Sequence, residues 1–374
     1  MKILITGGAG FIGKWITEKL PTSTEIVVVD LLDPQVHTTS QEFSPELQIR
    51  ATCIQADVRD IEAYRDMAEG SDVIIHLVAQ TGTGQSMYEM SKYIQHNADG
   101  TAKLLELVSS LKQKPRRIIL SSSRAVYGEG AFADGSAIFY TKGRRLRELQ
   151  QSIWEVCNEQ SKPLQPLPMQ ETHFANPTSV YGYTKLWQEQ IIQNYCDNQG
   201  IDAVIFRFQN VYGPKQELGN PYTGIMGIFT NSIVRHNRVE LFEDGLMTRD
   251  FVYVEDVAQS VVQAAFHERS LSSIINIGSG QATTLKELVT TIAQLTDKQP
   301  TVKVSGRFRV GDIRHAVADM TRYETLLGRW NPTSLEQGLR QHLDWYLGQI
   351  PPAEADLQAS LAEMEQKGLL QTSK

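Results

Sequence analysis

Residues 2–13 read KILITGGAGFIG, a short apolar run that leads into glycines at positions 7, 10 and 13. Glycine lets the backbone turn tightly and come close to a pyrophosphate. The residues that follow have helical periodicity, and the start of such a helix offers free N–H groups to an anion. The strand–loop–helix order therefore predicts a dinucleotide-binding site at Gly7, Gly10 and Gly13.

Further apolar, β-branched runs recur along the chain and alternate with stretches of helical character. These runs are EIVVVD (25–30), TCIQAD (52–57), DVIIHL (72–77), RRIIL (116–120) and AVIFR (203–207). Strands that are buried on both faces and separated by helices predict a doubly wound parallel sheet of the α/β class.

Acidic residues at the strand ends extend the predicted cofactor site. Asp30 ends the second run. A carboxylate there accepts hydrogen bonds from both ribose hydroxyls and repels a 2′-phosphate, which favours NAD over NADP. Asp57 and Val58 follow the third run, and we expect them to hold the adenine.

Composition and charge restrict the class of protein. The 374 residues carry a net charge of −7, so we expect neither nucleic acid nor an anionic membrane as a partner. The N-terminus is predicted to be a first strand rather than a signal peptide, and no window approaches the ~18 apolar residues of a membrane span. Cys53, Cys157 and Cys196 match no metal or redox spacing. We therefore expect reduced thiols, no metal site and a cytoplasmic location.

Two segments interrupt the α/β rhythm. Residues 129–176 are weakly patterned, contain the basic run KGRRLRE (142–148), and predict an insertion between a strand and a helix. We interpret the basic run as a solvated face. After Pro351 and Pro352, the sequence DLQASLAEMEQKGLL predicts a terminal amphipathic helix, interpreted as a docking or oligomer element.

The segment NPTSVYGYTK (176–185) predicts catalytic groups. Tyr181 and Lys185 are four residues apart and therefore neighbours on one helix face. The pKa of tyrosine in water is ~10, and lowering it by ~3 units requires about 4 kcal/mol of preference for the phenolate. A lysine one turn away and the positive nicotinamide ring of NAD⁺ are sources of that preference. Ser123 ends a predicted strand of the same sheet, where its hydroxyl could bridge a substrate oxygen and Tyr181, whereas Tyr183 faces elsewhere.

A series of motifs also occurs in the order found in one known family. The motifs are TGGAGFIG, ADVRD, HLVAQ, NADGT, SSSRAVYG, YGYTK, RFQNVYGPKQ, RDFVYVEDVA and INIGSG. Over residues 1 to about 345, the chain resembles the extended short-chain dehydrogenase/reductase family, in its sugar-nucleotide epimerase/dehydratase branch. The resemblance implies an NAD-binding Rossmann domain, a smaller C-terminal α/β domain that holds a nucleotide sugar, and a homodimer formed through the helices that follow NADGT and SVYGYTK.

The resemblance also implies domain boundaries. The NAD-binding domain is expected to span residues 1–209, and the segment at about 248–270 is expected to return to it. The nucleotide-sugar domain is expected to comprise residues 210–247 and 271–345. Residues 346–374 are expected to form a helical tail.

The match further implies roles for individual residues. Catalysis is assigned to Ser123, Tyr181 and Lys185. The residues implied to bind NAD are Gly7, Gly10, Phe11, Ile12, Gly13, Asp30, Asp57, Val58, Leu77, Ala79, Thr81, Asn97, Ser121, Tyr181 and Lys185. Those implied to bind the nucleotide sugar are Ser123, Asn210, Phe242, Arg249, Arg309 and Asp312. Arginine suits phosphate oxygens and an aromatic ring can stack on a base, but Arg307 and Arg314 cannot be ranked against Arg309 from the sequence.

The residues after Ser123 narrow the reaction. The family's 4,6-dehydratases carry an Asp–Glu pair at these two positions, whereas this chain has Arg124 and Ala125. Without a carboxylate there, elimination of water has no evident acid or base. The remaining chemistry is removal and return of a hydride at sugar C4, which is NAD-dependent 4-epimerisation of a nucleotide sugar.

A narrower resemblance points to one sugar. The segments WEVCNEQSKPLQPLPMQETH (154–173) and RFQNVYGPKQELGNPYTGIMGIF (207–229) are similar to a subgroup of dTDP-L-rhamnose 4-epimerases. Gln160 stands where the second cysteine of that subgroup's Cys-x-x-Cys pair would be, so no zinc or disulfide is expected there. Other hypotheses stay open: an NAD(P)-dependent reductase or oxidase of a 4-keto sugar, another epimerase or dehydratase that acts on a nucleotide sugar, and a non-catalytic NAD-sensing protein. The nucleotide of the substrate, dTDP or UDP, also stays open.

Overall fold

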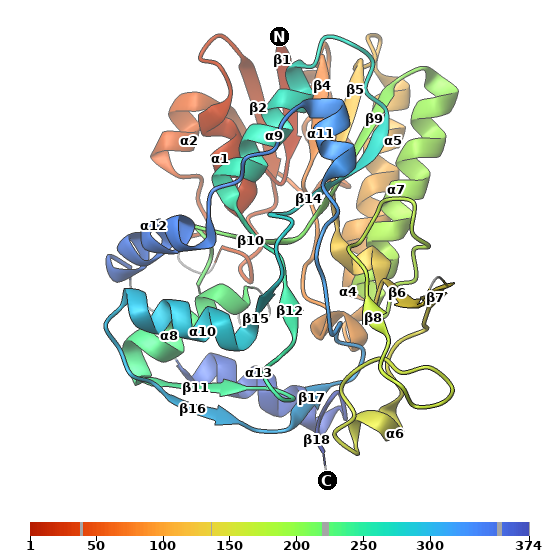
Figure 1. The fold of residues 1–374 in the computed structure, drawn as a ribbon. Coiled ribbons are helices and arrows are strands. Elements are labelled where there is room, and N and C mark those ends of the chain that lie inside the picture. Colours follow the sequence, from red (N-terminus) through yellow and green to blue (C-terminus); the bar gives the residue numbers. More distant parts are fainter. Residues whose placement is uncertain (38–39, 136, 219–223, 350–353, 374) are drawn as a thin grey trace.

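The computed structural model of the protein describes residues 1–37, 40–135, 137–218, 224–349 and 354–373. The centre of the molecule is a sheet of seven strands in the order β14-β9-β5-β4-β1-β2-β3 (Figure 1). The strands are β1 (Lys2–Thr6), β2 (Glu25–Asp30), β3 (Thr52–Gln55), β4 (Val73–His76), β5 (Arg117–Ser123), β9 (Asp202–Phe208) and β14 (Ser273–Ile277). Every neighbouring pair is parallel, which confirms the predicted Rossmann architecture.

Apolar side chains project from both faces of this sheet, because successive residues of a strand point in opposite directions. Ile3 of β1 packs with Ile16 of α1 in one buried cluster, and Leu4 packs with Ile192 of α7 in another. The helices that cover the first face are α1 (Phe11–Lys19), α9 (Val254–Phe266) and α11 (Thr321–Leu327), and those that cover the second are α5 (Gly100–Ser110) and α7 (Val180–Gln199). The sheet is therefore doubly wound, as predicted.

Short helical segments join these elements. They are α2 (Pro45–Arg50), η1 (Ile61–Ala63), α3 (Arg65–Ala68), η2 (Gln85–Met87), α4 (Met90–Tyr93), η3 (Ile94–Asp99) and η4 (Arg124–Tyr127). The strand order reverses at β1, which has β2 on one side and β4 on the other. In open parallel sheets, the crevice beyond the carboxyl ends of the strands at such a reversal is where ligands bind.

A smaller group of elements lies beyond those carboxyl ends (Figure 1). Its helices are α8 (Ile225–His236), α10 (Leu285–Leu295), α12 (Leu335–Leu347) and α13 (Glu354–Gln366). Its paired strands are β10 (Asn210–Tyr212) with β13 (Phe251–Tyr253), β11 (Arg238–Leu241) with β16 (Thr301–Val304), β12 (Thr248–Arg249) with β15 (Thr283–Thr284), and β17 (Arg307–Arg309) with β18 (Leu370–Thr372). Phe229, Leu241, Leu288 and Leu339 are buried together there, so this part has a core of its own.

Two elements beyond residue 270 belong to the main sheet and its cover. β14 pairs with β9 at the edge of the sheet. Tyr323 and Leu327 of α11 are buried in the same cluster as Ile275 of β14. The segment that returns to the Rossmann part therefore runs past the expected end at about residue 270, because the edge strand and its covering helix come later in the chain. The other domain boundaries stay predictions.

The segment between β5 and α7 has secondary structure of its own. Its elements are β6 (Ala131–Asp134), β7 (Ala137–Tyr140), α6 (Leu146–Leu149) and β8 (Gln165–Pro166), and the strands form a small sheet in the order β7-β6-β8. Phe132, Val156 and Leu164 form a small buried cluster beneath it. This segment therefore carries a compact substructure rather than a long unstructured loop.

The basic run in this segment is only partly solvated. Arg145 is exposed, but the guanidinium of Arg144 is buried, 3.0 Å from the Glu129 carboxylate and 2.8 Å from that of Glu243. Arg144 also donates a hydrogen bond of 2.8 Å to the carbonyl oxygen of Asp312. The interpretation of the run as a solvated face is therefore wrong at Arg144, which ties the segment to the C-terminal part.

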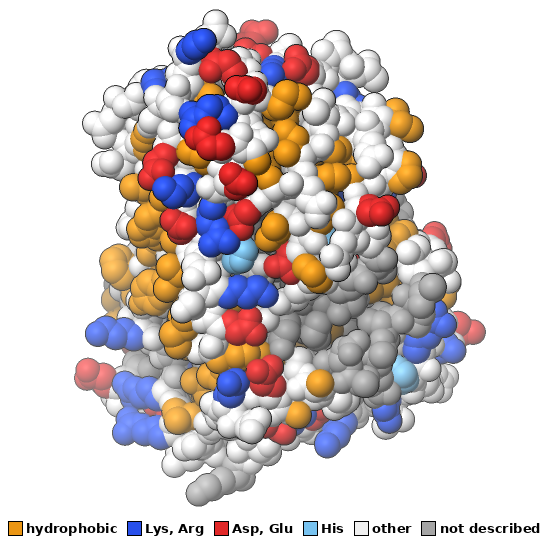
Figure 2. Space-filling model, turned by 180° about the vertical axis from the view of Figure 1, so that it is seen from behind, with side chains coloured by type: hydrophobic (Ala, Val, Ile, Leu, Met, Phe, Trp, Pro, Cys, Tyr) orange, Lys and Arg blue, Asp and Glu red, His pale blue; other side chains and the backbone are white. Residues whose placement is uncertain are grey.

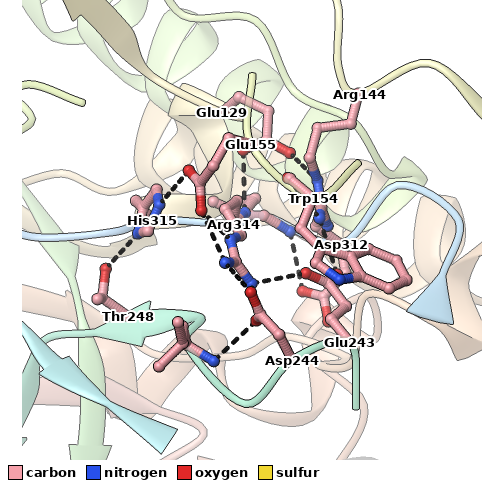
Figure 3. Close-up of polar contacts among 12 residues, drawn as sticks. Glu129, Arg144, Trp154, Glu155, Glu243, Asp244, Thr248, Asp312, Arg314 and His315 are labelled. Atoms are coloured by element: carbon pink, nitrogen blue, oxygen red, sulfur yellow. Dashed lines mark hydrogen bonds and ion pairs between the residues drawn. The ribbon is translucent and has the colours of Figure 1, made fainter. Parts of the chain in front are cut away.

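Arg314 is the second centre of this network, and Figure 3 shows acidic side chains converging on it. Its guanidinium lies 2.7 Å from Glu155, 3.0 Å from Glu243 and 2.7 Å from Asp244. The carboxylate of Glu155 also lies 2.8 Å from Nε2 of His315. Burial raises the pKa of Glu155, but hydrogen bonds from His315 and Arg314 outweigh this and lower the pKa to about 2.

The C-terminal tail contains the expected helix, α13, and a strand that was not expected. β18 pairs antiparallel with β17. Leu361, Met364 and Leu370 are buried together, and Tyr88 and Phe242 pack against them. The tail therefore contacts both the Rossmann part and the smaller part.

The surface lacks a large field of one sign on the side shown in Figure 2, where acidic and basic side chains are interspersed. Interspersed charges do not create the strong local potential of a typical nucleic-acid site. Within the described ranges, no helix has both the length and the apolar character required to cross a bilayer.

Glu155→Gln is predicted to destabilise the protein by about 1–2 kcal/mol at pH 7, since charged hydrogen bonds to Arg314 and His315 are lost. The folded-state pKa of Glu155 is depressed, so its contribution is complete above the unfolded-state value of about 4.3 and is lost as the pH falls towards 2. Denaturant unfolding of both proteins between pH 7 and pH 4 measures this difference, which should narrow below about pH 5. Glu336→Gln removes an exposed ion pair with Arg340 and should change stability by less than about 0.5 kcal/mol. Equal effects of the two variants would contradict a structural role for Glu155.

Candidate functional site

The loop between β1 and α1 brings its backbone close to neighbouring strands. Gly7 has φ +76°, and a Cβ atom there would lie 2.8 Å from the backbone nitrogen of Val78. A Cβ atom on Gly13 would lie 2.5 Å from the carbonyl oxygen of Gly8. Gly10 caps α1 without a side-chain hydrogen bond, so the helix N-terminus keeps donors for a ligand. Gly7 and Gly13 therefore leave no room for a side chain, and Gly10 leaves the start of α1 without a side-chain cap.

This loop opens into a cavity of about 470 Å³ at the reversal of the strand order. Most of the predicted site residues line it, and they come from both the cofactor and the catalytic sets. The predicted residues in its wall are Gly7, Gly10, Phe11, Ile12, Gly13, Asp30, Asp57, Val58, Leu77, Ala79, Thr81, Ser121, Ser123, Tyr181, Lys185 and Asn210. The fold thus brings together residues that the sequence separates widely.

The carboxylate of Asp30 lies in the wall of the cavity. It accepts hydrogen bonds from the backbone nitrogens of Ala9, at 3.0 Å, and Leu32, at 2.9 Å. Nε2 of His37 lies 3.4 Å from the same carboxylate, a neighbour that sequence reasoning missed. The carboxylate of Asp57 is held by Arg59 through hydrogen bonds of 2.9 and 2.6 Å. These hydrogen bonds hold both acids in the cavity wall.

Asn97 is the one predicted cofactor residue that does not line the cavity. Its side-chain oxygen accepts from the backbone nitrogen of Gln80, at 2.7 Å, and its side-chain nitrogen donates to Thr184, at 2.9 Å. It therefore connects the loop after β4 to helix α7. A direct contact with NAD stays a prediction, and the structure gives Asn97 a positioning role.

The catalytic set sits where β5 and α7 meet. Ser179 caps α7 by accepting a hydrogen bond of 3.1 Å from the backbone nitrogen of Gly182, which fixes the first turn that carries Tyr181. Ser123 and Tyr181 both line the cavity. Burial raises the pKa of Tyr181, while the neighbouring Ser123 hydroxyl and the charge of Arg124 lower it.

Lys185 lies on the same helix and is fully enclosed. Its Nζ donates a hydrogen bond of 2.7 Å to the carbonyl oxygen of Ser121. Burial lowers the pKa of Lys185 to about 7, and the charge of Glu189 opposes this effect. Glu189 in turn is paired with Arg207 at 2.7 Å. The lysine is therefore positioned by strand β5 and by a buried ion pair behind it.

Arg124 also lines the cavity. From the sequence alone it has no assigned binding or catalytic role, and its presence only excludes dehydratase chemistry. Its Nε donates a hydrogen bond of 2.9 Å to the side-chain oxygen of Asn210. Both residues line the cavity beside Ser123 and Tyr181. Asn210 therefore lines the cavity and fixes Nε of Arg124, while its contact with a substrate stays a prediction.

The other predicted substrate residues lie outside the cavity wall. Arg249 and Asp312 form an ion pair of 3.1 Å. The guanidinium of Arg309 lies 5.2 Å from the ring centroid of Phe242. None of these four residues lines the cavity, but the charges of Arg249 and Asp312 act on Arg124, which does. Their contact with a nucleotide stays a prediction.

The structure ranks the arginines that the sequence could not. Arg314 is committed to three carboxylates, and Arg307 is paired with Glu240 and Glu365. Nε of Arg309 is buried without a hydrogen-bond partner among the described residues. Of the three, Arg309 is the one with an unused donor for a phosphate oxygen.

The residues present fit a bound dinucleotide. The backbone at Gly7 leaves the room that a Cβ atom would fill, an anion-binding helix N-terminus follows, and Asp30 lies at the end of the adjacent strand. Tyr181 and Lys185 line the same cavity, and their role at the reacting end stays a prediction.

Comparison with known proteins agrees with this arrangement. The model of the NAD dependent epimerase/dehydratase family matches residues 3–147 and 152–278. The dTDP-L-rhamnose 4-epimerase of Burkholderia thailandensis is 39% identical over 350 residues, which cover 92% of this chain and 94% of that protein. The putative UDP-glucose 4-epimerase of Methanocaldococcus jannaschii is 28% identical, covering 92% of this chain and 97% of that protein.

Solved structures are similar over nearly the whole chain. The UDP-glucose 4-epimerase of Thermotoga maritima with UDP-glucose has a TM-score of 0.72 at 29% identity, covering 93% of this chain and 99% of that one. The UDP-glucuronic acid 4-epimerase of Bacillus cereus, in complex with UDP-glucuronic acid and NAD, has a TM-score of 0.73 at 26% identity, covering 92% and 98%. With the family match and the glycine loop, these similarities establish that the chain is an enzyme of the NAD-dependent epimerase/dehydratase family.

Proposed function

We propose that this protein is an NAD-dependent nucleotide-sugar 4-epimerase. The observation that carries the proposal is the pairing of an intact Ser123, Tyr181 and Lys185 set with Arg124 and Ala125 at the positions where a dehydratase needs acids. Neither the segment 121–127 nor the first turn of α7 contains a carboxylate. Proton transfer at a single hydroxyl is the chemistry that these groups support.

Tyr181 acts as the base and then as the acid. Its phenolate takes the proton of the sugar C4 hydroxyl, and the Ser123 hydroxyl holds the reacting oxygen beside it. Nζ of Lys185 is hydrogen-bonded to the carbonyl oxygen of Ser121. It provides a hydrogen-bond donor on the face of α7 that also carries Tyr181. NAD, when bound, accepts the hydride from C4 and later returns it. Tyr181 gives its proton back to the C4 oxygen once the 4-keto sugar has turned over in the pocket.

We propose that the smaller group of elements, beyond the carboxyl ends of the main sheet, binds the nucleotide end of the substrate. Arg249 and Arg309 supply positive charge for the pyrophosphate, with Asp312 beside Arg249. Phe242 offers an aromatic face for the base. Holding the substrate by its pyrophosphate lets the sugar rotate without leaving the cavity.

The sugar is proposed to be L-rhamnose linked to dTDP. This assignment is supported by the relative from Burkholderia thailandensis, which is 39% identical over most of both chains. UDP-hexoses are the competing class, because relatives and similar structures that act on or contain them lie at 25–29% identity. We place the enzyme in the cytoplasm, where its three free cysteines would stay reduced.

We further propose a homodimer formed by α7 and by α4 and η3, which directly precede α5, the helix after NADGT that the resemblance implies. Met90, Ile94, Tyr183 and Trp187 lie on these elements with exposed fractions between 38% and 57%. Sedimentation equilibrium should give a dimer, and Ile94→Glu with Trp187→Glu should give a monomer. Ile49→Glu, which changes an exposed residue elsewhere, should leave the dimer intact. A monomeric wild-type protein would refute this interface.

The proposed function predicts that a C4 epimer forms without net consumption of NAD. Purified protein, without added NAD, is incubated with dTDP-L-rhamnose and, separately, with UDP-glucose and UDP-N-acetylglucosamine. Proton NMR should reveal a C4 epimer of one of them, and denatured protein should release NAD. If no epimer forms and the protein contains no NAD, a reductase or oxidase that exchanges its cofactor becomes the better account.

Tyr181→Phe should reduce turnover by at least about 10²-fold, since the general base is lost. The variant should still contain NAD, because only the phenol oxygen is removed. Tyr195→Phe is the matched control, since Tyr195 lies on the same helix and its hydroxyl contacts Ser109. Retained activity in Tyr181→Phe would remove Tyr181 from the chemistry, and equal losses in both variants would indicate damage to α7.

A further inference from the structure

Arg124 has a guanidinium that is oriented but not fully used. It opens η4 directly after Ser123, and its Nε is fixed by the 2.9 Å hydrogen bond to Asn210. Its Nη1 is buried and, among the residues that the structure describes, has no hydrogen-bond acceptor. A buried cationic donor without an acceptor is unfavourable, so a ligand that brings an oxygen would complete this site.

The carboxylates near Arg124 do not provide a hydrogen-bond acceptor for its Nη1. Asp312 is paired with Arg249. Asp250 accepts hydrogen bonds from the backbone nitrogens of Ser279, at 2.6 Å, and Gly280, at 3.1 Å. Both carboxylates are therefore committed to other partners, although their charges and that of Arg249 act on Arg124.

Arg124 is also the cation whose field acts on the Tyr181 hydroxyl. Burial and the nearby charge of Arg249 lower the pKa of Arg124 to about 10, so it stays positively charged at neutral pH. The pKa of Lys185 is lowered to about 7, and its Nζ is already bonded to the carbonyl oxygen of Ser121. At neutral pH, Arg124 is thus a more permanent charge than Lys185 for stabilising a phenolate.

We propose that Arg124 is a second catalytic residue: its charge stabilises the phenolate of Tyr181, and its Nη1 donates a hydrogen bond to an oxygen of the substrate's sugar. This inference rests on the proposed function, because it takes Tyr181 as the base. It gives the arginine a role in the reaction beyond the dehydratase chemistry that its presence excludes.

The first test reads the ionisation of Tyr181 without any substrate. The phenolate absorbance of the NAD-loaded protein is titrated with pH, and the curve of Tyr181→Phe is subtracted to isolate Tyr181. Arg124→Gln removes the charge and should raise the pKa of Tyr181 by about one unit. Arg124→Lys keeps a charge and should leave the pKa near that of the wild type. Bound NAD and thermal unfolding establish that each variant is folded.

The second test reads the reaction. In Arg124→Gln, the acid limb of the kcat profile should move to higher pH by the same amount, so kcat below that limb falls about tenfold for each unit. Arg124→Lys should keep the wild-type limb but raise KM several-fold, because the fixed hydrogen-bonding fork is lost. Arg65→Gln, at an exposed ion pair with Glu62, should change neither quantity.

The outcomes separate the two proposals. If Arg124→Gln has the wild-type pKa of Tyr181 and the wild-type acid limb of the kcat profile, the charge role is overturned. If Arg124→Lys has the wild-type KM, the hydrogen bond to the substrate is overturned. If no nucleotide sugar is epimerised but Arg124→Gln still shifts the Tyr181 titration, the proposed function fails and the coupling of the two residues stands. If Arg124→Gln does not fold, an acid limb displaced in Arg124→Lys contradicts the charge role.

Discussion

The candidate site depends on the attachment of helix α7 to strand β5. Nζ of Lys185 bonds to the carbonyl oxygen of Ser121 at 2.7 Å. One turn further along the helix, Glu189 pairs with Arg207 of the neighbouring strand. These buried bonds fix the helix along and about its axis, so that Tyr181 comes to lie beside Ser123. Without them, the two hydroxyl groups would have no fixed relation, because they are far apart in sequence and lie on different elements.

The same attachment explains how one scaffold can support several reactions. The proposed proton-transfer pair is fixed by β5 and α7, while the two residues that follow Ser123 line the same cavity. Carboxylates at these positions would supply an acid and a base for elimination, whereas a guanidinium supplies neither. Arg124 therefore restricts the chemistry to one hydroxyl and, in our account, supports the base that acts on it.

Local patterns predicted the parts of the structure that local physics determines. The glycine loop, Asp30 and the Tyr181–Lys185 spacing are short-range features, and they lie in one cavity as expected. The sequence did not predict that Arg144 is buried between Glu129 and Glu243, because charge runs are usually solvated and both partners are distant in sequence. Strands β14 and β18 were also missed, since a short edge strand is specified by its pairing partner rather than by its own pattern. Positions 219–223, within a segment used for the narrower resemblance, lie outside the described residues.

The central claim is that the hydrogen removed from C4 of the sugar returns to the same carbon without exchange with water. The most direct measurement is conversion of dTDP-L-rhamnose by the purified enzyme in D₂O, with mass spectrometry and proton NMR of the epimer. Our account predicts that the product carries no deuterium on carbon, because a hydride does not exchange with water and only the hydroxyl proton passes through Tyr181. Deuterium at C4, or at a neighbouring carbon, would show removal of a carbon-bound proton and would contradict the mechanism.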